Sequence, residues 1–272
     1  MSLQFIMGNS GSGKSYCLYD TVVREAIENP DKNYLVIVPE QFTMQTQKDL
    51  CLAHPKGGIM NIDVLSFGRL AYRVFEEVGQ DARVVLDDEG KNLVLRKIAG
   101  ECEKDLKVFK GNLKKQGYIS EVKSVLSEFA QYGVDFERLD DFMKEVPPES
   151  YLHYKLDDIR TIYEKFEEYL SEKYITKEEM LDVLSDAVPY SDILKGSVVA
   201  MDGFTGFTPV QNRLIGELFS VCEKVMITVT MDGRENPYVY EHPYQIFALG
   251  KQMVTSLMKI AGEKKTEIEE PI

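Results

Sequence analysis

Residues 8–15 read Gly-Asn-Ser-Gly-Ser-Gly-Lys-Ser and directly follow a short apolar stretch at residues 3–7. The spacing Gly-x-x-x-x-Gly-Lys-Ser is typical of a P-loop, which wraps phosphate groups between a strand and a helix. Glycines let backbone N–H groups approach phosphate oxygens closely, and the following helix directs the positive end of its dipole at the anion. An ordinary glycine-serine loop can carry the same letters. The strand-like residues before it and a helical pattern over 16–27, ending at Asn29-Pro30, favour the P-loop.

The residue types in this loop predict a nucleotide with a magnesium ion. We expect Lys14 to reach the β- and γ-phosphates and Ser15 to place its hydroxyl on Mg²⁺. Such a site also needs an acid at the end of a neighbouring strand, and Asp202 follows the apolar run at 198–201. Its alternative interpretation is a turn residue in Asp-Gly. The residues predicted to bind the nucleotide are Gly8, Asn9, Ser10, Gly11, Ser12, Gly13, Lys14 and Ser15, with Ser15 and Asp202 at the metal.

The pattern of apolar residues predicts an α/β protein. Strand-like runs at 4–7, 34–38 and 59–65 alternate with amphipathic stretches, which is the rhythm of a parallel sheet. Helical spacing then dominates until strand-like runs return at 196–202 and 224–232. We therefore expect a P-loop NTPase (RecA-like) sheet formed by 1–86 and 196–232, with an all-helical insertion at 87–195. Residues 233–272 are expected to begin a further, incomplete segment, with a frayed tail from Gly262 onward.

Composition narrows the classes of protein. The 272 residues carry a net charge of −13, so the chain lacks the overall basic footprint of a free-standing DNA-binding domain. It has no apolar run long enough to span a membrane and no signal-peptide pattern, so we expect a cytoplasmic protein. The four cysteines and three histidines are scattered, which favours reduced thiols over disulfides or a zinc site.

Four segments together carry a resemblance to a known family. They are Gly8–Ser15, Val-Pro-Glu-Gln-Phe-Thr at 38–43, Leu-Ser-Phe-Gly-Arg-Leu-Ala-Tyr-Arg-Val at 65–74, and Asp-Gly-Phe-Thr-Gly-Phe-Thr-Pro-Val-Gln at 202–211. In this order the chain resembles the first motor domain of superfamily-one DNA helicases. More narrowly, it is similar to the AddB (RexB) family, the B subunits of bacterial ATP-dependent helicase/deoxyribonucleases.

The resemblance implies a set of ligands and partners. ATP and Mg²⁺ are the implied cofactors, single-stranded DNA and duplex ends are the implied substrates, and an AddA-type helicase/nuclease subunit is the implied partner in a heterodimer. It also implies that the chain is an N-terminal part of a longer subunit, whose nuclease domain and iron–sulfur cluster lie downstream. It places Gln41 and Thr43 near a loop that touches single-stranded DNA and Ser66 at the head of a helicase segment. Helical spacing adds Arg69 and Arg73 to these candidate DNA contacts.

The chain departs from active helicases at the positions that hydrolyse ATP. Gly203 follows Asp202 where those enzymes carry a catalytic glutamate, and Thr228–Asp232 lacks their sensor glutamine. The chain also holds no second motor domain that would supply an arginine finger. These departures predict nucleotide binding without efficient hydrolysis. No catalytic residue can be assigned, although Glu40 is a possible substitute base.

Several residues keep two interpretations. Phe67 and Tyr72 are able to stack on bases, but helical spacing favours a core position for Phe67. Arg69 and Arg73, four residues apart on one helical face, contact either phosphate or acidic neighbours. The lysines of the 104–115 segment favour a solvated face over a DNA contact.

Three function classes follow. The first, which we favour, is an ATP-binding, hydrolysis-deficient helicase-like domain acting in DNA scanning and scaffolding for recombinational repair. The second is an active ATP-driven DNA translocase, and the third is a P-loop kinase of a small substrate. A kinase is disfavoured because the middle of the chain is long, acidic and helical.

Overall fold

The computed structural model describes residues 1–79, 83–113, 115–171 and 173–272. The chain forms two compact units, one made of Met1–Gln80 with Leu181–Ile272 and the other of Asp81–Met180. The insertion is predicted at 87–195, whereas the second unit begins at Asp81 and ends at Met180. The second of these boundaries falls within a helix, α8 (Lys177–Ala187).

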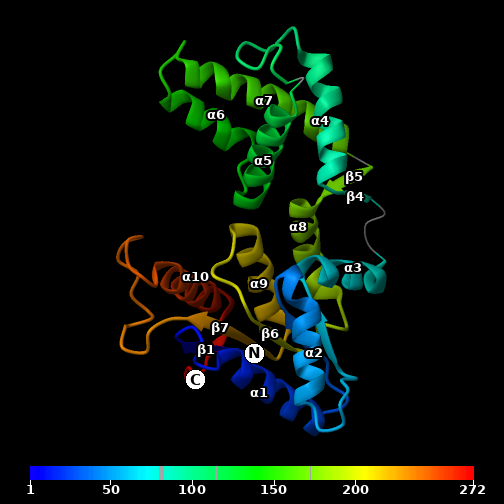
Figure 1. Cartoon of the computed structure of the whole chain (residues 1–272), viewed down its shortest axis with the longest axis vertical. Coiled ribbons are helices and arrows are strands. Elements are labelled where there is room, and N and C mark those ends of the chain that lie inside the picture. Colours follow the sequence, from blue (N-terminus) through cyan, green and yellow to red (C-terminus); the bar gives the residue numbers. More distant parts are fainter. Residues whose placement is uncertain (80–82, 114, 172) are drawn as a thin grey trace. The chain divides into compact units, whose positions relative to one another are not determined.

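The first unit is built on a six-stranded sheet with the order β3-β2-β6-β7-β1-β8. Every strand pairing in the described residues is parallel. The predicted α/β class is therefore confirmed. β7 lies between β1 and β6, so the strand that ends at Gly8 is one strand away from the strand that precedes Asp202, as predicted (Figure 1). The strands are β1 (Ser2–Gly8), β2 (Tyr34–Ile37), β3 (Ile62–Leu65), β6 (Val198–Met201), β7 (Lys224–Thr230) and β8 (Glu267–Ile268).

The strands β2 and β6 are hydrophobic and buried at every residue, because the sheet is covered on both faces. Side chains of successive strand residues point to opposite faces. One set, including Ile6, Val36 and Ala200, packs with Leu18 and Val22 in a single core cluster. The alternate residues, such as Phe5, Leu35 and Val199, are equally buried and face the opposite layer. This pattern is typical of a parallel sheet covered by helices on both faces.

The helices of the first unit begin and end at recognisable signals. Ser66 caps α3 by accepting from the backbone N–H of Arg69, and Gly79 ends that helix in a left-handed conformation. Thr208 and Gln211 form a capping box at the start of α9. The helices are α1 (Lys14–Glu28), α2 (Thr43–Ala53), α3 (Phe67–Val78), α9 (Pro209–Val221) and α10 (Ala248–Lys264), with short 3₁₀ turns at Glu40–Phe42 and Val188–Tyr190.

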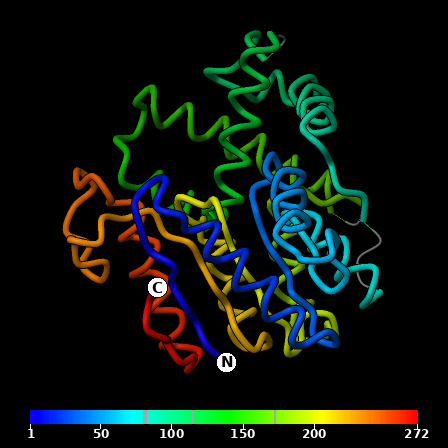
Figure 2. Tube along the Cα trace, turned by 60° about the horizontal axis from the view of Figure 1, so that its bottom comes forward, coloured from blue at the N-terminus to red at the C-terminus, as the bar shows by residue number. Residues whose placement is uncertain are grey.

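The C-terminal residues form part of the sheet, so the expectation of a frayed tail is wrong. α10 continues to Lys264, and β8 pairs in parallel with the start of β1. Beyond β8, the backbone N–H of Ile272 donates to the Phe5 carbonyl, and the N–H of Met7 donates to the Ile272 carbonyl. Figure 2 shows this red segment running beside the blue β1. The tail is ordered because it satisfies the backbone groups of β1 on its outer edge.

The second unit is helical, with one small sheet that the all-helical prediction omitted. β4 and β5 form a two-stranded parallel pair at the two ends of this unit. Strands this short are set by their pairing partner and carry little local signal. The elements are β4 (Val84–Leu86), α4 (Asp88–Cys102), α5 (Gln116–Tyr132), α6 (Phe136–Glu145), α7 (Tyr151–Leu170) and β5 (Tyr174–Thr176).

One buried carboxylate organises the connection between α4 and α5. Asp158, on α7, is 1% exposed. Its two oxygens accept the backbone N–H groups of residues 107, 108 and 109 at 2.7–2.8 Å. A charged acceptor with three donors is well satisfied in a buried position.

The described residues contain no helix that is long and apolar enough to cross a membrane. All four cysteines are free thiols.

Candidate nucleotide site

The predicted phosphate-binding loop joins the end of β1 to the start of α1. Gly11 and Gly13 have φ angles of 77° and 92°, in the left-handed region that favours glycine. A Cβ on Gly8 would lie 2.3 Å from the Ser12 Oγ, so a larger residue there would require the Ser12 side chain to move. Gly11 and Gly13 therefore stand where the turn of the loop favours glycine.

The loop presents positive charge and hydrogen-bond donors. Gly13 caps α1 without a side-chain hydrogen bond, and the first N–H groups of a helix have no acceptor within the helix. Lys14 Nζ donates to the Asn9 carbonyl at 2.8 Å, which holds the ammonium over the loop. Burial lowers the pKa of Lys14, and the nearby Asp202 carboxylate partly opposes that effect. The arrangement is suited to an anion.

Asp202 lies beside the first turns of α1. It follows the last residue of β6 and is 8% exposed. Tyr19 Oη donates to Asp202 Oδ2 at 2.7 Å, across 183 residues of sequence. Because Tyr19 is four residues after Ser15, the two side chains share one face of α1. The carboxylate is therefore on the same side of α1 as the Ser15 hydroxyl.

These residues fit a magnesium–nucleotide complex. Mg²⁺ prefers oxygen ligands and is commonly held by one or two protein groups together with water and substrate phosphates. A hydroxyl at Ser15 and a carboxylate at Asp202 meet that need. Within the described residues, no three His, Cys, Asp or Glu side chains cluster in a way that could hold a metal. A cation at this site would take its remaining ligands from water and the phosphates.

The residue after Asp202 offers no catalytic group. Gly203 has a φ of 80°, and an added Cβ would contact the Pro39 ring at 3.5 Å. A side chain in this position would strain the backbone, because non-glycine residues rarely adopt such φ values. Both the sequence and the conformation thus differ from an Asp-Glu pair.

Glu40, the possible substitute base, is engaged by other residues. Its carboxylate accepts a hydrogen bond from Ser66 Oγ and forms an ion pair with Arg69 at 3.3 Å. The Ser66 hydroxyl in turn accepts the Arg69 backbone N–H. Three residues singled out in the sequence therefore form one cluster, in which Glu40 serves as an acceptor for its neighbours.

The residues predicted to approach DNA differ in accessibility. Thr43 and Ser66 are buried, and Thr43 Oγ1 donates to the Glu40 carbonyl. Gln41 and Arg69 are exposed. Arg73 is also exposed and pairs with Asp63 at 2.9 Å. Among these five residues, only Gln41, Arg69 and Arg73 have side chains exposed enough to contact DNA directly. Both arginines already have an acidic partner.

Phe67 occupies the core, the interpretation that its spacing favoured. It is buried, and its ring lies 5.4 Å from that of Phe204 and 6.4 Å from that of Phe207. Phe204 and Phe207 are themselves 5.1 Å apart. This aromatic cluster packs the start of α3 against the loop that follows Asp202. Tyr72, by contrast, is exposed.

Sequence reasoning missed three residues that surround Asp202. Tyr19, Thr46 and Thr228 come from α1, α2 and β7. Thr228 Oγ1 donates to Asp202 Oδ1 at 2.6 Å, and Tyr19 Oη lies 3.2 Å from Thr46 Oγ1. The four-residue spacing between Ser15 and Tyr19 is the one sequence signal that could have identified Tyr19. The positions of Thr46 and Thr228 depend on how distant helices and strands pack together.

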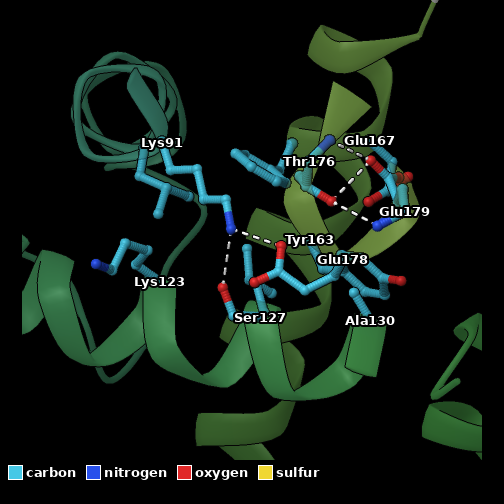
Figure 3. Close-up of a pocket in the computed structure, with 12 residues that line it drawn as sticks. Lys91, Lys123, Ser127, Ala130, Tyr163, Glu167, Thr176, Glu178 and Glu179 are labelled. Atoms are coloured by element: carbon cyan, nitrogen blue, oxygen red, sulfur yellow. Dashed lines mark hydrogen bonds and ion pairs between the residues drawn. The ribbon is translucent and has the colours of Figure 1, made fainter. Parts of the chain in front are cut away.

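A second cluster of charged groups lies inside the helical unit. Lys91 is 2% exposed, and its Nζ donates to Ser127 Oγ at 3.2 Å and pairs with Glu178 at 2.7 Å (Figure 3). Glu179 accepts from the backbone and hydroxyl of Thr176 nearby. Burial raises the pKa of Glu167, with a further contribution from Glu179, to about 7. The hollow among these side chains has a volume of about 10 Å³, which accommodates one water molecule rather than a substrate.

The lysines of the 104–115 segment are solvated, except that Lys114 lies outside the described residues. Lys107 pairs with Asp157 at 2.9 Å and lies over the Tyr154 ring. Lys115 lies over the Tyr118 ring at 6.0 Å. Lys107 and Lys115 therefore interact with side chains close to them in the folded unit.

Comparison with known proteins places the whole chain in one group. The model of a family described as "ADDB, N-terminal" matches residues 5–272. The chain is 46% identical over its full length to the B subunit of the ATP-dependent helicase/deoxyribonuclease of Lachnoclostridium phytofermentans. Proteins of the same name from Alkaliphilus metalliredigens and Clostridium tetani are 35% and 34% identical over 85% and 100% of the chain. The chain spans only 24%, 20% and 24% of the lengths of these three relatives.

Proposed function

The chain belongs to the AddB N-terminal family, and from this premise we propose that it is the ATP-binding, helicase-like part of a subunit that processes broken DNA ends. The relatives are named as subunits of an ATP-dependent helicase/deoxyribonuclease. In this proposal the chain folds as a P-loop NTPase domain carrying a helical insertion, and it acts in DNA scanning and as a scaffold during recombinational repair.

The observation that carries the proposal is the position of Asp202. The hydrogen bond from Tyr19 holds this acid against the helix that starts with Lys14 and Ser15. A loop of glycines alone is a weak sign of nucleotide binding. A loop, a lysine, a hydroxyl and a buried acid gathered at the carboxyl edge of one parallel sheet support it much more strongly.

In the proposed complex the protein binds and orients ATP. The amides of the 8–15 loop and the start of α1 receive the phosphates, and Lys14 neutralises part of their charge. Ser15 and Asp202 would hold the Mg²⁺ ion, whose contribution is to offset the charge of the β- and γ-phosphates.

We propose further that hydrolysis is slow. Efficient turnover needs a group that positions the attacking water and a cation that stabilises the transition state, and an arginine finger alone contributes about 10³–10⁵ in rate. Gly203 has no side chain for the first role, and Glu40 already accepts from Ser66 and pairs with Arg69. We propose that bound ATP acts together with DNA and with an AddA-type partner subunit, as the resemblance to the AddB family implies.

The main alternative is an active ATP-driven translocase, and Glu40 is the residue that would make it possible. Rotation of Glu40 away from Ser66 and Arg69 would release a carboxylate at the end of β2, next to β6 in the sheet. A P-loop kinase finds less support, because the relatives are named as subunits of an ATP-dependent helicase/deoxyribonuclease.

Calorimetric titration of the purified chain with Mg²⁺–ATP, paired with a single-turnover hydrolysis assay, tests the proposal. We expect binding that weakens roughly 10- to 100-fold in Lys14→Ala, because the lost contact is a hydrogen bond to a charged group. The matched control is Lys48→Ala, an exposed lysine on α2. Hydrolysis at about 1 s⁻¹ or faster, abolished by both Lys14→Ala and Glu40→Gln, would establish the translocase alternative instead.

A further inference from the structure

Asp202 is held by hydroxyl groups on both of its oxygens. Thr228 Oγ1 donates to Oδ1 at 2.6 Å, and Tyr19 Oη donates to Oδ2 at 2.7 Å. Tyr19 Oη also lies 3.2 Å from Thr46 Oγ1. These four side chains come from the end of β6, from β7, from α1 and from α2, so they connect the sheet to two helices on one of its faces.

The direction of each hydrogen bond follows from counting protons. A tyrosine hydroxyl has one proton, and the Asp202 carboxylate has none to offer when ionised. Since Tyr19 donates to Asp202, Thr46 must be the donor in its contact with Tyr19. The chain of donation therefore runs from Thr46 to Tyr19 to Asp202, and Thr228 donates to the same carboxylate from the other side.

Tyr19 is suited to remain a donor. The hydroxyl of an ordinary tyrosine ionises only at about pH 10. The hydroxyl keeps its proton throughout the physiological range. Each Asp202 oxygen still has one free lone pair, so both hydroxyl contacts can persist while the carboxylate accepts from a further group.

We propose that Tyr19 is a positioning residue for the magnesium–nucleotide complex, which it serves by orienting the Asp202 carboxylate and tying it through Thr46 to α2. This inference rests on the proposed function. Without the Tyr19 hydroxyl the carboxylate would lose one of the two contacts that fix its orientation, and its free lone pairs would no longer be held in one direction. The nucleotide phosphates are bound by the loop itself, so the loss should be felt only when the metal is present.

Titration of the chain with ATP by calorimetry, once with Mg²⁺ and once with excess EDTA, separates these effects. In Tyr19→Phe we expect the Kd for ATP with Mg²⁺ to rise about tenfold, which is the usual scale for one hydrogen bond to a charged group. The Kd in EDTA should stay within about twofold of the unaltered chain. Tyr16→Phe is the matched control, because Tyr16 lies on the same helix and is 74% exposed, and it should change neither value.

Thr228→Val provides a second variant in case Tyr19→Phe fails to fold. It removes the donor to the other oxygen and should show the same metal-dependent weakening. Equal Kd values for Tyr19→Phe and the unaltered chain in Mg²⁺ would overturn the positioning role. So would an equal weakening in Mg²⁺ and in EDTA, which indicates a general structural effect. If the unaltered chain binds ATP in neither buffer, the proposed function itself fails and the inference fails with it.

Discussion

At the scale of single residues, acidic side chains in this protein occupy two different kinds of environment. Asp158 and Asp202 are almost fully buried, and each accepts several hydrogen bonds. Glu167 borders the hollow of the helical unit beside Glu179, and its pKa is raised to about 7. The first two carboxylates have hydrogen-bond donors for their oxygens, whereas burial and the neighbouring Glu179 carboxylate disfavour the ionised form of Glu167. These environments predict different consequences of substitution.

Asp158→Ala should strongly destabilise the helical unit. The substitution leaves three backbone N–H groups near residues 107–109 without their acceptor, and we expect a loss of about 3–5 kcal/mol in unfolding free energy. The neighbouring Asp157→Ala removes only an exposed ion pair with Lys107 and should leave the unfolding midpoint nearly unchanged. Urea unfolding followed by circular dichroism measures both. Similar midpoints for the two variants would show that Asp158 does not anchor this loop.

Glu167 should make the helical unit more stable as the pH falls from 8 toward 6. Its pKa is raised to about 7 in the folded unit, so the folded state binds a proton that the unfolded state releases. Stability is therefore gained on acidification and lost as the pH rises through 7. After a discount for solvent screening of this partly exposed group, we expect a change of about 1 kcal/mol.

Amide exchange in α5 and α7, measured at several pH values, reports this dependence for the helical unit. The slope in the opening free energy should flatten in Glu167→Gln. It should persist in Glu168→Gln, which alters an exposed acid on the same helix. A slope that survives in Glu167→Gln would assign the titration to another group.

At the scale of elements, local sequence patterns predicted those parts of the fold that local physics determines. The apolar residues of β2, β6 and β7 are buried on both faces, and Gly11 and Gly13 of the 8–15 loop have the left-handed φ angles that favour glycine. The three-residue strands β4 and β5 and the two-residue β8 were missed, because pairing with distant residues creates them. The same limit applies to the site. Lys14 and Ser15 were identifiable from spacing, whereas the bond between Tyr19 and Asp202 joins residues 183 positions apart.

The edge formed by the C-terminal residues leads to an element-scale prediction. Because the Met7 N–H donates to the Ile272 carbonyl, its hydrogen exchange should be slow in the chain. Removal of residues 267–272 should accelerate that exchange and lower the melting temperature, since the outer edge of β1 loses its partner. Glu269→Gln is a suitable control: it weakens the ion pair with Lys224 but leaves the backbone bonds in place. Unchanged exchange at Met7 after truncation would show that this edge is not paired in solution.

At the scale of the whole molecule, charge limits what the chain can do alone. With a net charge of −13, it repels a polyanion at long range, and the exposed arginines near the candidate site, Arg69 and Arg73, already have acidic partners. Lys107 likewise pairs with Asp157. Strong binding to DNA would require these ion pairs to exchange for phosphate contacts. It would also require additional positive charge from other segments of a larger assembly.

We therefore expect the chain to bind single-stranded DNA weakly, with a Kd of about 10⁻⁴–10⁻⁶ M and a small dependence on salt. If Arg69 and Arg73 make the only phosphate contacts, the slope of log K against log salt should be about −1 to −2. Anisotropy of a labelled oligothymidine at about 50 and 200 mM salt measures this slope, and Arg69→Ala should reduce it by about half. Lys144→Ala, which breaks a surface pair with Asp141 in the helical unit, is the matched control. Nanomolar binding at physiological salt would contradict this view, because it would require a basic surface that the described part of the chain does not display.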